Sequence, residues 1–221
     1  MSQSTTWPPS AGLTTNVVSR KDAVLQCFSS KHVAAPAATV FEAILRVEDY
    51  HKWNRWVPKA QIISQSPSDD PNVDINDLSR MRSGTIMNFP AIMDAKKPEK
   101  VSDAELQVTD ISTPNSPSEY VSKEILETDG SFTADLSRVY RVSWALHGGF
   151  VARGLKTERF HEVIVTGENE CEVRTWEVMG GVLAYTVKWM FRANLRENFE
   201  LWMTDLKAWS EKLHLDQSAS T

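Results

Sequence analysis

Three ionisable residues with complementary chemistry fall on neighbouring strand-like segments in the second half of the chain: Arg159, His161 and Glu177. Successive strand residues point to opposite faces, so residues two apart share one side. If that side faces the interior, a buried Glu177 carboxylate needs a partner, and Arg159 or His161 can supply it. His161 would then act as a general acid or base that Glu177 orients. The alternative is a structural ion pair near the sheet edge, and a register shift of one residue would turn all three side chains outward.

Other polar and aromatic residues are candidate ligand contacts. Trp144 and Tyr140 share one side of a strand-like segment, and Trp144 either stacks on a planar ligand or fills the core. Tyr185 lies at the entry to a long helix, where its hydroxyl either donates to a ligand carbonyl or packs in the ordinary way. The predicted ligand-binding residues are Trp144, Tyr140, Tyr185, Thr175, Met179, Arg82 and Asn88.

Motifs for other kinds of chemistry are missing from the sequence. His161-Glu162 begins a metalloprotease-like string, but Val165 stands where the second histidine ligand belongs. The five histidines show no metal-ligand spacing. There is no nucleophile elbow, no phosphate-binding glycine loop and no dinucleotide fingerprint. We therefore expect no metal and no cofactor, so any catalysis must use an acid–base pair in a pocket.

The elements that must position these residues follow from local patterning. A strand is predicted at 23–34, and Pro36 opens a helix whose apolar face carries Phe41 and Ile44. A short second helix and a turn are predicted at 48–56. Further strands are predicted at 57–64, 80–93, 101–111, 119–127, 137–147, 156–166 and 171–179. This order, closed by a helix, predicts an α+β fold built on an antiparallel sheet.

One long amphipathic helix is predicted to follow a strand that runs through Gly180-Gly181. Its apolar positions recur at steps of three and four residues, the period of a single helical face. They are Phe191, Leu195, Phe199, Trp202, Leu206, Trp209 and Leu213. Side chains this large need a broad apolar surface, and a curved sheet that grips the helix would leave a cavity between them. The alternative is that the helix only closes a core.

Composition limits the class of protein. The 221 residues carry 24 basic and 29 acidic side chains, a net charge of −5 without a basic run, so no nucleic-acid partner is expected. Cys27 and Cys171 are too few and too far apart for a disulfide scaffold and indicate buried thiols in a reducing compartment. Residues 1–15 do not resemble a secretory signal, and no apolar run approaches the length of about 18 residues that spans a membrane. These features predict a soluble, cytoplasmic protein.

The predicted organisation is a single domain at 21–215 between two flexible tails, at 1–20 and at 216–221. The polar, turn-rich stretch 64–78 is predicted to be an inserted loop. The proline-interrupted stretch 89–98 is predicted to cap a cavity mouth as a lid. The sequence leaves the oligomeric state open.

A recognisable pattern opens the domain. Ala35-Pro36 follows a strand, Val40-Phe41 lies in a helix, and Tyr50-His51-Lys52-Trp53-Asn54 forms a turn. With the long helix after Gly181, this pattern resembles the START/Bet v 1-like superfamily, which includes polyketide cyclases and lipid-transfer proteins. The resemblance covers residues 23–214. It implies a helix-grip fold, a curved antiparallel β-sheet wrapped around the C-terminal helix with an internal apolar cavity.

The same resemblance implies binding of lipids, sterols, flavonoids, quinones or polyketides, and for some members cyclisation, dehydration or hydrolysis. Fold alone does not decide among these functions. The leading hypothesis is binding of a hydrophobic small molecule (lipid, polyketide, terpenoid or quinone-like) for carriage or presentation. The first alternative is a cofactor-independent cyclase, dehydratase or isomerase of secondary metabolism that uses an acid–base pair in the cavity. The second is an interaction module for a protein or membrane partner, which predicts an exposed apolar patch.

Overall fold

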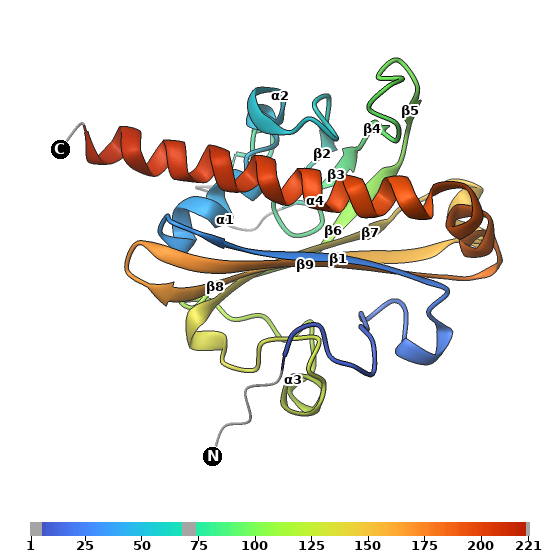
Figure 1. The fold of residues 1–221 in the computed structure, drawn as a ribbon, viewed down its shortest axis with the longest axis horizontal. Coiled ribbons are helices and arrows are strands. Elements are labelled where there is room, and N and C mark those ends of the chain that lie inside the picture. Colours follow the sequence, from blue (N-terminus) through green and yellow to red (C-terminus); the bar gives the residue numbers. More distant parts are fainter. Residues whose placement is uncertain (1–5, 68–73, 220–221) are drawn as a thin grey trace.

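The fold is α+β, as seen in a computed structural model that describes residues 6–67 and 74–219 (Figure 1). The strands are β1 (Leu25–Val33), β2 (Gln61–Ser64), β3 (Ile86–Asn88), β4 (Ala91–Ile92), β5 (Val101–Ser102), β6 (Glu105–Ser112), β7 (Val139–Leu146), β8 (Lys156–Gly167) and β9 (Glu170–Gly180). The α-helices are α1 (Ala37–Leu45), α2 (Tyr50–Trp53), α3 (Lys123–Thr128) and α4 (Val182–Ser218). Short 3-10 turns are η1 (Arg20–Asp22), η2 (Val47–Asp49), η3 (Leu136–Arg138) and η4 (Val151–Arg153).

An antiparallel sheet of seven strands forms the centre of the molecule. Its order is β1-β9-β8-β7-β6-β3-β2, so the first strand of the chain pairs with the last. In the β8–β9 hairpin Arg159 lies opposite Glu177, and His161 lies opposite Thr175. Because side chains alternate, all four point to one face of the sheet, the face that strand parity predicted. The register that the candidate site required is therefore confirmed.

The helix α4 lies along that face of the sheet, with α1 and α2 on the same side (Figure 1). The chain turns into the helix at Gly181, whose φ of 85° lies in the left-handed region. A Cβ at this position would lie 2.5 Å from the carbonyl oxygen of Gly154, so only glycine fits the turn. The predicted apolar stripe is confirmed. Its buried members are Leu195, Phe199, Trp202 and Leu206, and Phe191, Trp209 and Leu213 pack partly buried against the same core.

No helix in the described ranges is both long enough and apolar enough to cross a membrane. The sheet and the long helix together confirm the predicted helix-grip fold.

The opposite face of the sheet is covered too, which corrects the prediction of a flexible tail at 1–20. Residues 6–20 run beside α3 below the sheet (Figure 1), and Leu13 is fully buried there. The sheet presents Phe160 and Trp176 on this face, and burying such side chains contributes about 1.5–3 kcal/mol each. The N-terminal segment supplies the cover, and the Trp176 indole donates to the Thr14 carbonyl at 3.0 Å. The tail prediction is wrong for residues 6–20, and residues 1–5 lie outside the described residues.

A buried ion pair lies between the sheet and this outer layer. Arg141 is 1% exposed and Glu162 is 0% exposed, and two guanidinium nitrogens donate to one Glu162 oxygen at 2.6 and 2.9 Å. The backbone N–H and the hydroxyl of Thr133 also donate to the Glu162 carboxylate. Buried charges of this kind are tolerated only when they are paired and hydrogen-bonded. Because Thr133 lies in the loop before β7, its bonds to Glu162 fix that loop against the sheet.

The strand predicted at 119–127 is wrong, because this segment contains the helix α3. The Ser122 hydroxyl caps the helix by accepting a hydrogen bond from the Ile125 backbone N–H. Leu126 is then buried under the outer face of the sheet together with Val121. A serine cap before a short apolar pattern was the local signal for a helix.

The inserted loop predicted at 64–78 is partly described, because residues 68–73 lie outside the described ranges. In the described part, the Gln65 side-chain amide donates to the carbonyls of Asp77 and Arg80. These bonds join the two ends of the loop.

The C-terminal tail predicted at 216–221 begins too early. The helix α4 continues through these positions to Ser218, so residues 216–218 are helical. Residues 220–221 lie outside the described residues.

Candidate functional site

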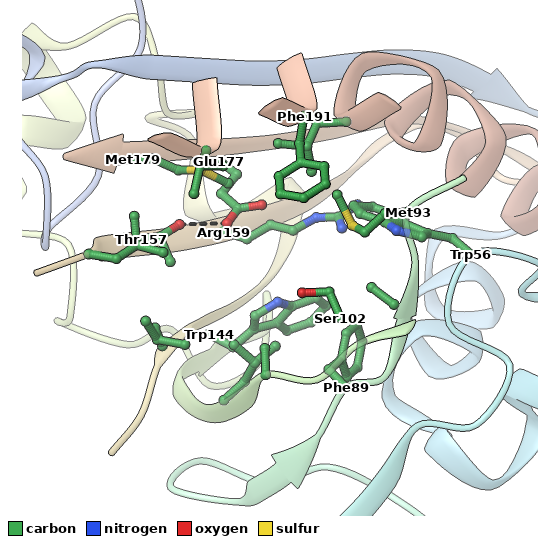
Figure 2. A pocket seen from close by; sticks show the side chains of 17 residues that line it. Trp56, Phe89, Met93, Ser102, Trp144, Thr157, Arg159, Glu177, Met179 and Phe191 are labelled. Atoms are coloured by element: carbon green, nitrogen blue, oxygen red, sulfur yellow. Dashed lines mark hydrogen bonds between the residues drawn. The ribbon is translucent and has the colours of Figure 1, made fainter. Parts of the chain in front are cut away.

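A cavity of about 190 Å³ lies between the inner face of the sheet and the N-terminal half of α4 (Figure 2). Its wall is mostly apolar and includes Phe89, Met93, Trp144, Leu155, Phe191 and Leu195. Three polar side chains, Thr157, Arg159 and Glu177, come together on the β8–β9 part of this wall. Cavities for drug-sized ligands run from about 300 to 1,000 Å³, so this one suits a small or slender molecule.

The predicted lid at 89–98 forms one side of the cavity. The lid contains β4, which pairs with the following strand β5 as a separate two-stranded sheet. Its residues Phe89, Ala91 and Met93 line the cavity. The Asn198 side chain on α4 donates to the Ile92 carbonyl at 3.2 Å. This bond ties the hairpin to the helix across the cavity.

Arg159 is a buried cation in an aromatic enclosure. The residue is 3% exposed, and its guanidinium carbon lies 4.2 Å from the ring centroid of Phe199, 4.7 Å from that of Trp202 and 4.8 Å from that of Trp56. Its Nε donates to the Thr175 hydroxyl at 3.1 Å. Contacts between a cation and an aromatic face contribute about 0.5–2 kcal/mol each. Burial lowers the pKa of Arg159 to about 10, which still leaves the side chain charged at neutral pH.

Glu177 contributes to the cavity wall a carboxyl group whose pKa is raised. It accepts a hydrogen bond from the Thr157 hydroxyl at 2.5 Å, drawn as a dashed line in Figure 2. Burial raises the pKa of Glu177 above its ordinary value of 4.5, against the opposing effects of Arg159 and of the Thr157 bond. A carboxyl with a raised pKa that faces a cavity is a candidate general acid or base.

His161 does not take part in the predicted acid–base pair. It is fully buried between Trp144 and Trp202, with ring centroids 4.5 and 5.4 Å away, and it is not part of the cavity wall. Neither ring nitrogen has a hydrogen-bond partner in the part of the chain that the structure describes. Burial and the charge of Arg159 hold the pKa of His161 well below 6.5, so the ring is neutral. The prediction that Glu177 orients His161 is wrong, because the imidazole packs between two tryptophan rings while the Glu177 carboxylate accepts its hydrogen bond from Thr157.

The predicted ligand contacts divide into two groups. Trp144 and Met179 line the cavity. Thr175 is buried behind it and holds Arg159 in place, while Tyr140 packs against Phe41 at a centroid distance of 5.3 Å. The sequence placed all four on the inner face of the sheet. Only the packing of α1 and α4 decided which of them border empty space.

Three other predicted contacts do not line the cavity. Tyr185 is 66% exposed on the first turns of α4, before the buried stripe of that helix begins. Arg82 lies in the turn before β3, where its backbone N–H donates to the Thr85 hydroxyl. Asn88 lies on β3, one residue before Phe89, so the alternation along the chain turns Phe89 into the cavity instead.

Sequence reasoning missed several cavity residues. Thr157 lies two residues before Arg159 on the same strand, so strand parity was sufficient to find it. Phe191 was identified as part of the helix stripe but not as a cavity residue. Trp56 becomes a cavity residue through packing between distant segments, which no local pattern shows, whereas Phe89 belongs to the stretch predicted as a lid.

Large apolar side chains are exposed near one end of the cavity. A second hollow of about 410 Å³ lies beside the cavity, because the two share Ser102, Ala104, Leu146, Leu155 and Val187 in their walls. Phe150 and Val151 border this hollow and are 80% and 51% exposed.

Comparison with known proteins identifies the family. Residues 33–206 match the model of the family described as "Polyketide cyclase / dehydrase and lipid transport". The chain belongs to this family. A match over this much of the chain confirms the START/Bet v 1-like resemblance, and it includes Thr157, Arg159 and Glu177 of the cavity wall.

Individual relatives of this chain are distant in sequence. "Oxopyrrolidines biosynthesis cluster protein O" of Penicillium oxalicum is 26% identical over 211 residues, which cover 90% of this chain and 93% of the relative. An aromatase/cyclase from Streptomyces sp. R1128 has a TM-score of 0.54 at 9% identity, covering 85% of this chain and 94% of that one. A START superfamily protein from Mycobacterium smegmatis has a TM-score of 0.53 at 14% identity, with 85% and 98% coverage. Both likenesses to solved structures establish the fold alone.

Proposed function

We propose that the protein binds a hydrophobic small molecule of secondary metabolism in the cavity under α4 and carries or presents it. The observation that carries this proposal is a mostly apolar cavity wall on which three polar groups, Thr157, Arg159 and Glu177, gather at one place. Apolar surface gives a ligand its affinity, and a few fixed polar groups set its orientation. The family covers both cyclases and lipid transport, and one relative is named for a biosynthetic cluster. These similarities support a polyketide, terpenoid, quinone-like molecule or lipid as the ligand.

We also propose a cytoplasmic location. Cys27 and Cys171 are both buried free thiols, and unpaired cysteines are typical of reducing compartments. Burial raises the pKa of each thiol to about 12, so neither is reactive as a thiolate.

Native mass spectrometry tests the binding function. The purified chain is exposed to an extract of its source cells, and the ligands that it retains are released and identified. We expect a discrete small-molecule mass on the wild-type protein and its loss in Ala104→Phe, which adds a ring inside the cavity wall. A surface variant, Lys123→Gln on α3, is the matched control and should retain the ligand. Equal retention by all three proteins, or no retained molecule, would contradict the proposal.

A cyclase or dehydratase is a second candidate function, favoured by the raised pKa of Glu177 inside the cavity. Such an enzyme needs a bound conformer and a group that can move a proton, and a positioned acid or base contributes about 10²–10⁴-fold to a rate. Glu177 would be the catalytic residue, and Arg159 would bind the developing negative charge. If the identified ligand is converted by the wild type, Glu177→Gln should lose conversion in that range while it still binds the ligand. Unchanged conversion by the variant would exclude Glu177 as the acid or base.

A further inference from the structure

The guanidinium of Arg159 forms no close ion pair in the described structure, and the charge of Glu177 acts on it only from beyond 4.0 Å. Its only hydrogen bond in the described residues goes from Nε to the neutral Thr175 hydroxyl. The Nη2 atom is buried and has no hydrogen-bond partner among those residues. Glu177 lies opposite Arg159 on β9 but bonds to Thr157, and no ion pair within 4.0 Å joins it to Arg159 in the described ranges. The cavity wall thus contains a buried cation with unused donors.

The surroundings of the guanidinium do not replace a counter-ion. Phe199, Trp202 and Trp56 offer only the negative faces of their rings. A buried charge is strongly disfavoured unless another charge and hydrogen bonds compensate it. On the outer face of the sheet, by contrast, the buried Arg141 has the Glu162 carboxylate as its partner. The same fold therefore gives one buried arginine a directly bonded carboxylate and leaves the other with a guanidinium nitrogen that no described residue bonds.

A neutral ligand oxygen could accept a hydrogen bond from Arg159, but it would leave the charge uncompensated. An oxyanion does both, and hydrogen bonds between a guanidinium and an oxyanion are shorter and stronger than neutral ones. Apart from Ser102, Thr157 and Glu177 the rest of the wall is apolar, so most of the ligand beyond that group is expected to be hydrophobic.

We infer that the ligand carries an oxyanion, either a carboxylate or the enolate of a β-dicarbonyl group, and that Arg159 binds it. This inference rests on the proposed function, because it needs a ligand in the cavity. Arg159 is then the residue that determines specificity, selecting hydrophobic acids over the corresponding neutral molecules. Thr175 is a positioning residue that acts through its bond to Arg159 Nε.

Isothermal titration calorimetry of the full chain with matched probes tests the inference. Naphthoate, naphthamide and acetylnaphthalene share one apolar body and differ in the group offered to Arg159. We expect naphthoate to bind about tenfold more tightly than either neutral probe, or more, from the strength of hydrogen bonds to charged groups. Binding of an enolate is tested with a phenyl-substituted cyclic β-diketone, whose enol is acidic. The methyl enol ether of the same compound is neutral and is the control.

Two variants assign the preference to Arg159. Arg159→Gln should bring the affinity for naphthoate down to that for naphthamide and leave the naphthamide affinity within about threefold of wild type. Arg192→Gln removes an exposed positive charge from α4 and should keep the full preference. This control separates a specific contact from general electrostatic attraction.

The possible results are distinguishable. Equal binding of naphthoate and naphthamide by the wild type overturns the inference and leaves the proposed function intact, and this comparison does not depend on whether Arg159→Gln folds. A preference that persists in a folded Arg159→Gln also overturns it. Failure of every probe to bind, together with no ligand retained from cell extract, overturns the proposed function itself.

Discussion

The substitution His161→Phe tests whether a buried, unpaired imidazole destabilises the protein in acid. Both ring nitrogens lack hydrogen-bond partners in the described residues, and the ring lies between Trp144 and Trp202. Burial and the nearby charge of Arg159 hold its pKa well below 6.5. In the folded state the ring therefore stays neutral at pH values where the unfolded chain has already taken up a proton.

The sign and size of the effect follow from proton linkage. Below pH 6.5 the unfolded state binds one more proton at His161 than the folded state, so stability falls as pH falls. The slope approaches about 1.4 kcal/mol per pH unit. Between pH 7.5 and pH 5.0 the wild type should lose about 2 kcal/mol through this one residue, and His161→Phe should not. At pH 7.5 the phenyl ring removes two unpaired polar atoms, which raises the free energy of unfolding by about 1–3 kcal/mol. The larger ring also overfills the site, which lowers the free energy of unfolding by about the same amount.

Urea unfolding followed by tryptophan fluorescence at pH 7.5, 6.5 and 5.0 measures the difference. The difference between variant and wild type should grow by about 2 kcal/mol in favour of the variant as the pH falls. His51→Gln, at an exposed histidine on α2, is the matched control and should follow the wild type. If the variant and the wild type lose stability in parallel, His161 takes up its proton in the folded protein and the reasoning is refuted.

Three further predictions concern other buried residues. Leu13→Ala should lower the free energy of unfolding by about 2–5 kcal/mol in urea, because Leu13 is fully buried under the sheet, whereas a flexible tail would give no change. Glu162→Gln should cost about 3–5 kcal/mol by leaving the Arg141 charge unpaired, and the double variant Arg141→Met/Glu162→Leu should recover part of that loss in the same assay. Because the pKa of Glu177 is raised, the wild type should lose stability relative to Glu177→Gln as the pH rises above 4.5. A constant difference between those two proteins from pH 4.5 to pH 7 would contradict the raised pKa.

Much of the candidate site was predictable because it depends on strand alternation. Val173, Glu177 and Met179 were assigned to the inner face from parity alone, and the register of β9 against β8 agrees. The same rule correctly placed Arg159 beside Glu177. It failed for His161, because two residues on one face of a strand can border a cavity or be sealed by neighbouring rings, and parity does not distinguish these outcomes.

The sequence by itself determined the elements whose periodicity is strong, above all α4 and the long strands β8 and β9. A helical repeat of three and four residues, or a strand repeat of two, depends only on residues that are neighbours in the chain. It can therefore be recognised before the fold is known. Only the tertiary structure decided what covers the outer face of the sheet. Leu13 and Val18 stand alone in a polar segment, and their burial becomes favourable only once Phe160 and Trp176 are assembled opposite them. The cavity is likewise a property of packing: it is the space that Trp56, Phe89 and the α4 stripe leave unfilled, and no local pattern contains it.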